Sequence, residues 1–100
     1  MIVLTIKTTP EFDKWMGSIR DRITYIRLAR RLDRAQQGNL GDVKQVGEGV
    51  FEMREHFGPG WRMYFVRRGR ALIVMLGGGD KATQAADIAR AVKMAANMEE

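Results

Sequence analysis

The alternation of apolar and polar residues predicts a short strand and then a short helix in the first part of the chain. Residues 2–7 are aliphatic and β-branched, a composition that favours a strand. Thr9 precedes a proline and is suited to cap a helix over 10–17, because proline is tolerated in the first helical turn. Phe12 and Trp15 would form the buried side of that helix.

A longer helix is predicted from Ser18, as its N-cap, to Gly38, which would stop it. Apolar residues recur along it at helical spacing and predict its buried side: Ile19, Ile23, Ile26, Leu28, Ala29 and Leu32. Four arginines are spaced so that they share another side: Arg20, Arg27, Arg31 and Arg34. Two interpretations of these arginines stay open, a solvated surface or a contact with RNA phosphates or an acidic partner.

From residue 42 onward the pattern changes to strands and then to a final helix. The four predicted strands cover 42–46, 50–55, 61–67 and 70–76. Three glycines would end the last of them, and its nearly continuous apolar run predicts burial on both faces. Asp80 is positioned to cap the closing helix, whose buried stripe would be Ile88, Val92 and Ala95.

This element order predicts an α+β fold, with an N-terminal helical hairpin and a C-terminal helix packed on a twisted, mostly antiparallel sheet. A length of 100 residues without a linker predicts a single domain over 1–100. The absence of cysteine excludes disulfides, thiolate metal sites and a thiol nucleophile. His56 is the one histidine, so neither a metal site nor a cofactor is expected. Without a signal-peptide pattern or a long apolar run, we expect a cytoplasmic protein that does not engage a membrane.

The net charge of +5 is concentrated in two regions. Residues 1–34 carry eight basic and four acidic side chains, and residues 61–70 carry four arginines and no acid. Concentrated basic charge indicates a polyanionic or an acidic protein partner, although an ordinary basic surface has the same composition. The candidate RNA contacts are Arg20, Arg27, Arg31, Arg34, Arg67 and Arg68.

Four residues at predicted strand ends and loop edges form the candidate catalytic group: Arg54, His56, Arg62 and Lys81. If the sheet brings them to one end, they suit a phosphodiester, because guanidinium groups hold its oxygens and stabilise charge that develops on phosphorus. Cleavage by the RNA 2′-hydroxyl then needs only in-line geometry, charge stabilisation and proton transfer. His56 is the first acid–base candidate and Tyr64 the second. The competing interpretation is ordinary ion pairing, such as Arg54 with Glu52.

Three stretches together resemble a known toxin family: residues 49–54, 58–65 and 76–84. They are similar to the phage-derived "addiction module killer protein" branch of the RelE/ParE superfamily, which includes HigB-like toxins of type II toxin–antitoxin systems. The resemblance implies a RelE-like fold and a ribosome-dependent mRNA endonuclease, an interferase that needs no metal. The implied partners are the ribosome with its mRNA and a cognate antitoxin with a helix-turn-helix domain. Operator DNA would be reached only through that antitoxin.

The resemblance carries over unevenly to individual residues. Arg62 matches the phosphate-stabilising arginine of RelE toxins, and Arg54 and Lys81 match basic positions around it. Glu52 stands near a position where RelE has a basic residue, and no tyrosine follows in the C-terminal region to match that of RelE. The acid–base role therefore falls to His56 or Lys81. Two alternatives stay open: a ParE-like toxin that blocks DNA gyrase, and a non-enzymatic partner of a DNA-binding repressor.

Overall fold

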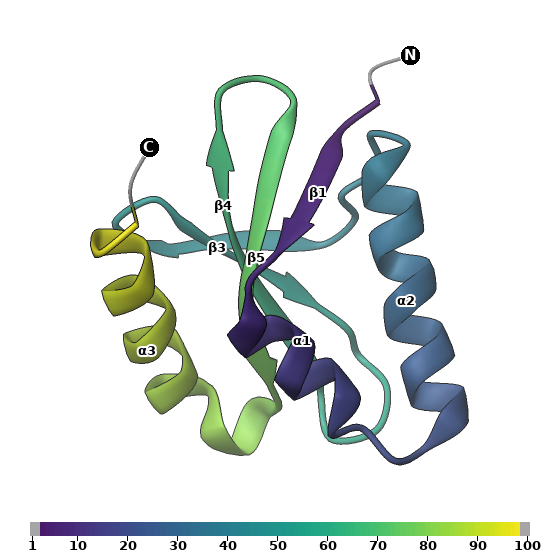
Figure 1. Cartoon of the computed structure of the whole chain (residues 1–100). Coiled ribbons are helices and arrows are strands. Elements are labelled where there is room, and N and C mark those ends of the chain that lie inside the picture. Colours follow the sequence, from purple (N-terminus) through teal and green to yellow (C-terminus); the bar gives the residue numbers. More distant parts are fainter. Residues whose placement is uncertain (1–2, 99–100) are drawn as a thin grey trace.

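The computed structural model describes residues 3–98, which form a mixed sheet with helices on both faces (Figure 1). The strands are β1 (Thr5–Thr8), β2 (Val43–Gly47), β3 (Val50–Arg54), β4 (Arg62–Arg68) and β5 (Leu72–Gly79). The helices are α1 (Pro10–Gly17), α2 (Arg22–Gln36) and α3 (Gln84–Ala96), and a short 3-10 turn, η1 (Lys81–Thr83), precedes α3. The α+β fold predicted from the sequence is confirmed.

The strand order in the sheet is β1-β5-β4-β3-β2. The pairs from β2 to β5 are antiparallel, whereas β1 joins β5 in parallel. The strand predicted over 2–7 forms at Thr5–Thr8, and residue 2 lies outside the described part of the chain. From Ile73 to Leu76, β5 is buried on both faces, as its apolar run predicts.

The sheet separates two clusters of buried side chains. α1 and α2 cover one face, where Phe12, Leu28 and Phe65 belong to the same cluster. α3 covers the other face, where Tyr64 and Ala91 belong to the second cluster. Because side chains alternate along a strand, neighbours on β4 such as Tyr64 and Phe65 point toward different helices.

Three glycines extend β5 to residue 79 instead of ending it at residue 76, as the sequence pattern predicted. A Cβ on Gly78 would lie 2.6 Å from the ring of Trp15, and one on Gly79 would lie 1.9 Å from Oδ2 of Asp87. Larger residues would collide with these side chains, so the glycines let α1 and α3 approach the end of β5 closely.

α2 begins later than predicted. Its N-cap is Asp21 and not Ser18, since Oδ2 of Asp21 accepts a hydrogen bond from the Thr24 amide at 3.0 Å. Ser18 instead follows α1, and its hydroxyl donates to the carbonyl oxygen of Trp15. Arg20 therefore lies in the connection between the two helices and does not share a helical face with the other arginines.

The buried face of α2 also differs from the predicted one. Its buried residues are Thr24, Leu28, Arg31 and Ala35. Ile23 and Ile26, which were predicted to be buried, are 69% and 38% exposed. Leu28 and Ala35 are fully buried and fix the orientation of the helix, and the helical period then turns the two isoleucines outward. Gly38 follows the helix with a φ of 94°, which confirms the predicted stop.

The final helix also starts after the predicted position. Asp80 caps η1, where its side chain accepts a hydrogen bond from the Ala82 amide at 2.9 Å, and α3 begins at Gln84. The predicted stripe of Ile88, Val92 and Ala95 packs half-buried against the second cluster, beside the buried Ala91. Across residues 3–98, no helix has the length and apolar character needed to cross a membrane.

Candidate functional site

The ends of the central strands bring Arg54, Arg62 and Lys81 to one end of the sheet. Arg54 closes β3 and stands opposite Arg62, the first residue of β4. Arg62 in turn stands opposite Gly79, and Lys81 follows two residues later. The loop between β3 and β4 packs against both: a Cβ on Gly60 would lie 3.4 Å from Nη1 of Arg62 and from Cβ of Lys81. The three cationic residues therefore meet where the sequence predicted, and we call this region the cationic end.

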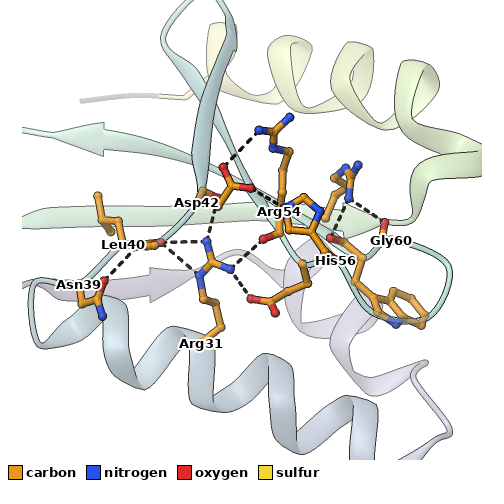
Figure 2. Close-up of polar contacts among 11 residues, drawn as sticks. Arg31, Asn39, Leu40, Asp42, Arg54, His56 and Gly60 are labelled. Atoms are coloured by element: carbon orange, nitrogen blue, oxygen red, sulfur yellow. Dashed lines mark hydrogen bonds and ion pairs between the residues drawn. The ribbon is translucent and has the colours of Figure 1, made fainter.

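A carboxylate that sequence reasoning did not single out, Asp42, links Arg54 to His56 at the cationic end (Figure 2). Oδ1 of Asp42 lies 3.2 Å from Nη2 of Arg54, and Oδ2 lies 2.6 Å from Nε2 of His56. The hydrogen bonds to His56 and then to Arg54 lower the pKa of the Asp42 carboxyl below its usual value. His56 is thus held through one ring nitrogen while 70% of its side chain stays exposed. The strand register explains the position of Asp42, because Val43 pairs with Met53 and so sets the preceding residue beside Arg54.

Arg62 is largely enclosed, with 9% of its side chain exposed. Its Nη1 donates to the carbonyl oxygens of Gly60 at 3.1 Å and Trp61 at 3.4 Å, and its Nε lies 3.8 Å from Oε1 of Glu52. Among the described residues, Nη2 has no hydrogen-bond partner, so it is the nitrogen left for a ligand. The sequence left open that Arg54 forms an ion pair with Glu52. In the structure Glu52 faces Arg62, and Arg54 pairs with Asp42.

Tyr64 is not available for acid–base chemistry. Its side chain is 1% exposed, and its hydroxyl donates to Oε2 of Glu52 at 3.0 Å. Burial, followed by the charge and hydrogen bond of Glu52, raises the pKa of the Tyr64 hydroxyl far above its ordinary value. Because this hydroxyl neither reaches a substrate nor ionises readily, the sequence-based choice of Tyr64 as a second acid–base candidate is wrong.

Arg31 was predicted to lie on the exposed arginine face but is a buried anchor, 5% exposed (Figure 2). Its guanidinium donates to the carbonyl oxygens of Leu40, Asp42 and Arg54 over 2.8 to 3.1 Å, and it pairs with the carboxylate of Glu55. These bonds fasten α2 to the chain around the cationic end. The prediction failed because the backbone carbonyls of Leu40, Asp42 and Arg54 face α2 and need a hydrogen-bond donor. The spacing of residues along the helix does not reveal these carbonyls.

Two further candidate RNA contacts, Arg27 and Arg34, are exposed on the side of α2 that borders the loop after β3. Together with Arg30 and Glu55 they line a recess of about 190 Å³. The guanidinium carbon of Arg27 also lies 3.7 Å from the centre of the Phe57 ring, a cation–π contact with the loop that follows β3. α2 therefore presents an exposed basic surface, which meets the buried Arg31 at the shared Glu55 carboxylate.

The last pair, Arg67 and Arg68, is far from the cationic end along the sheet. Both residues close β4 at the turn into β5, at the opposite end of the strand from Arg62. Figure 1 shows this β4–β5 hairpin extending beyond the rest of the sheet. Within residues 3–98, no group of three or more His, Asp or Glu side chains is arranged to hold a metal ion.

Comparison with known proteins identifies a family and a fold. A family model described as "Phage derived protein Gp49-like (DUF891)" matches residues 11–98. An uncharacterized protein of Haemophilus influenzae is 38% identical over 94 residues, which cover 94% of this chain and 95% of the relative. A chain in the crystal structure of the toxin–antitoxin complex RelBE2 from Mycobacterium tuberculosis superimposes with a TM-score of 0.63 and 14% identity, covering 80% of this chain and 100% of its own length. At that identity the match shows the fold alone, a RelE-like one. The chain therefore belongs to the Gp49-like family of phage-derived proteins, and its fold is the RelE-like one that the sequence resemblance implied.

Proposed function

We propose that this chain is the toxin of a bacterial type II toxin–antitoxin pair and that it cleaves messenger RNA on the ribosome. The observation that carries the proposal is the meeting of Arg54, Arg62, Lys81 and His56 at the cationic end. Guanidinium and ammonium groups beside an exposed imidazole suit the phosphodiester of a polyanion. The family type and the RelE-like fold support the toxin role.

The proposed reaction uses groups of this chain and of the RNA. The 2′-oxygen attacks the adjacent phosphorus, the bond from phosphorus to the 5′-oxygen breaks, and a 2′,3′-cyclic phosphate forms. The proton of the 2′-hydroxyl passes to a base, and the leaving 5′-oxygen takes a proton from an acid. His56 is assigned to proton transfer because it is exposed and is oriented by Asp42. Nη2 of Arg62, together with Arg54 and Lys81, is assigned to stabilising the negative charge on the phosphate oxygens.

Exposed arginines away from the cationic end are assigned to binding the RNA backbone. These are Arg20 in the connection between helices, Arg27 and Arg34 on α2, and Arg67 on the hairpin, joined there by the half-buried Arg68. Arg31 is left out of this assignment because its guanidinium is occupied inside the protein.

The proposed partners follow from the same assignment. The ribosome with its mRNA is the target, which places the activity in the cytoplasm. A cognate antitoxin with a helix-turn-helix domain would neutralise the toxin, in the arrangement of HigB-like systems, and would carry the complex to operator DNA.

Mapping the 5′ ends of cellular transcripts after a brief induction tests the proposal. The parent protein should produce new ends within translated frames. Arg62→Lys and His56→Ala should lose these ends while circular dichroism still reports a folded protein, because Arg62→Lys keeps a positive charge beside Glu52 and His56→Ala leaves the buried side chains around Arg62 in place. Cutting by both variants at the parent level would refute the assigned site.

The same induction separates the alternatives. Intact transcripts together with loss of supercoiling by purified gyrase would identify a ParE-like toxin. A folded product without any effect on growth would identify a non-enzymatic partner of a DNA-binding repressor.

A further inference from the structure

A fully buried carboxylate, Glu52, lies beside the guanidinium of Arg62. Oε2 of Glu52 accepts hydrogen bonds from the Tyr64 hydroxyl at 3.0 Å and from the side-chain amide of Gln84 at 2.8 Å. Oε1 lies 3.8 Å from Nε of Arg62, and neither of these two atoms has a hydrogen-bond partner among the described residues. A carboxylate buried this deeply requires a compensating cation, and Arg62 is the one that its ion pair supplies.

The surroundings of Arg62 restrict its guanidinium on two sides. Nη1 is held by the carbonyl oxygens of Gly60 and Trp61, and Nε faces Glu52. A guanidinium is planar, so fixing the directions of Nε and Nη1 also fixes the direction of the Nη2 hydrogens. The orientation of the one nitrogen left for a ligand therefore depends on Glu52.

The carboxylate is in turn held by two different elements. Tyr64 comes from β4, in direct register with Glu52, and Gln84 is the first residue of α3. Both donors bind Oε2, which turns Oε1 toward Arg62. The distance of 3.8 Å is longer than a hydrogen bond, so the pair acts through charge and orientation and not through a tight bond.

We propose that Glu52 is a positioning residue for Arg62, which holds the guanidinium so that Nη2 is offered to the scissile phosphate. Tyr64 and Gln84 keep the carboxylate in place for this role. The part of this inference that concerns the scissile phosphate rests on the proposed function. The fixed orientation of the Arg62 guanidinium does not depend on that function.

Two readouts on Glu52→Gln test the proposal, with Glu48→Gln in the exposed β2–β3 turn as the matched control. The first is the NMR signal of the Arg62 Nε–H group and its hydrogen exchange, which requires no RNA. We expect slow exchange in the parent and the control, and exchange faster by about tenfold or more in Glu52→Gln. The second readout is single-turnover cleavage of ribosome-bound mRNA. We expect the rate to fall roughly 10- to 100-fold, with the half-saturating ribosome concentration little changed.

The outcomes are separable. Unchanged exchange in Glu52→Gln overturns the positioning role whatever the cleavage data show. Faster exchange with cleavage at the parent rate overturns the role in catalysis. Faster exchange in a protein whose parent does not cleave RNA supports the positioning of Arg62 and refutes the proposed function instead. If Glu52→Gln does not fold, Gln84→Met removes one donor to Glu52 from a half-buried site, and the same rule applies to its Arg62 signal.

Discussion

Arg30 and Arg31 are neighbours on α2, yet their guanidiniums lie in opposite surroundings. Arg31 is buried and donates to backbone carbonyls of two other segments, whereas Arg30 is exposed and lines the recess between α2 and Glu55. Removing a buried donor leaves its acceptors unsatisfied, and removing an exposed one returns the site to water. Arginine therefore stabilises the fold at position 31, whereas at position 30 it contributes only positive charge to the surface.

This contrast gives a prediction for stability. Arg31→Ala should lower the free energy of unfolding by about 3–5 kcal/mol, because the Glu55 carboxylate and several carbonyl oxygens lose their donor. Arg30→Ala should change it by no more than about 0.5 kcal/mol. Urea denaturation followed by circular dichroism measures both. Equal midpoints for the two variants would show that Arg31 is not an anchor.

Asp42 adds a pH dependence to folding. Since the folded state lowers the pKa of its carboxyl below the ordinary 3.8, the stability it contributes is present above that value and is lost as the pH falls through the lowered one. Between about pH 5 and pH 2, the parent should therefore lose more stability than Asp42→Asn, which has no such proton to bind. Unfolding curves at a series of pH values give the comparison. Parallel losses in the two proteins would contradict the contribution of Asp42.

At the scale of helices and strands, the sequence predicted the elements better than their boundaries. Ser18 and Asp21 both suit a helix cap, and local pattern alone does not decide between them. The end of α1 decides, because the Ser18 hydroxyl is occupied by the Trp15 carbonyl. Ile23 likewise points outward because of how α2 packs against the sheet. The spacing of apolar residues in the sequence does not reveal that packing.

The candidate site was predictable to a similar degree. The meeting of Arg54 and Arg62 follows from strand ends that neighbour each other across a loop, so it could be expected from the sequence. The position of Asp42 depends on the register between β2 and β3, which no local pattern fixes. The enclosure of Arg62 depends on Glu52 and on the loop carbonyls around it, and these are tertiary contacts.

The glycines of β5 allow a test at this scale. Gly78→Ala should destabilise the fold by about 1–3 kcal/mol, because its Cβ would collide with the Trp15 ring and force α1 away from the sheet. Gly77→Ala is the matched control, since a Cβ there meets nothing within 4 Å. Thermal unfolding of the two variants measures the difference. A Gly78→Ala protein as stable as Gly77→Ala would mean that the helix does not pack as closely as described.

Across the described residues, positive charge is concentrated at the cationic end, around the recess on α2 and on the β4–β5 hairpin. The recess on α2 adjoins the cationic end through Glu55, whereas the hairpin lies at the other end of β4, so a ligand that engages all three places must span the length of that strand.

Salt dependence measures whether α2 contributes to such binding. If Arg34 contacts a phosphate, Arg34→Ala should reduce the slope of log affinity against log salt concentration for ribosomes by about 1. Lys93→Ala, which removes the same charge from an exposed position on α3, should leave the slope as it is. Equal slopes for the parent and both variants would remove Arg34 from the binding surface.

The parallel pairing of β1 with β5 also fixes an order of events when the chain is made. β1 is the first strand to be synthesised, and it finds its neighbour only when β5, the last strand of the sheet, has emerged. The surroundings of Arg62 also depend on β5, because Arg62 pairs with Gly79 only after that strand has been synthesised. A ribosome making this protein therefore holds an incomplete sheet until β5 has been synthesised, and a product that stopped before β5 would lack the arrangement around Arg62.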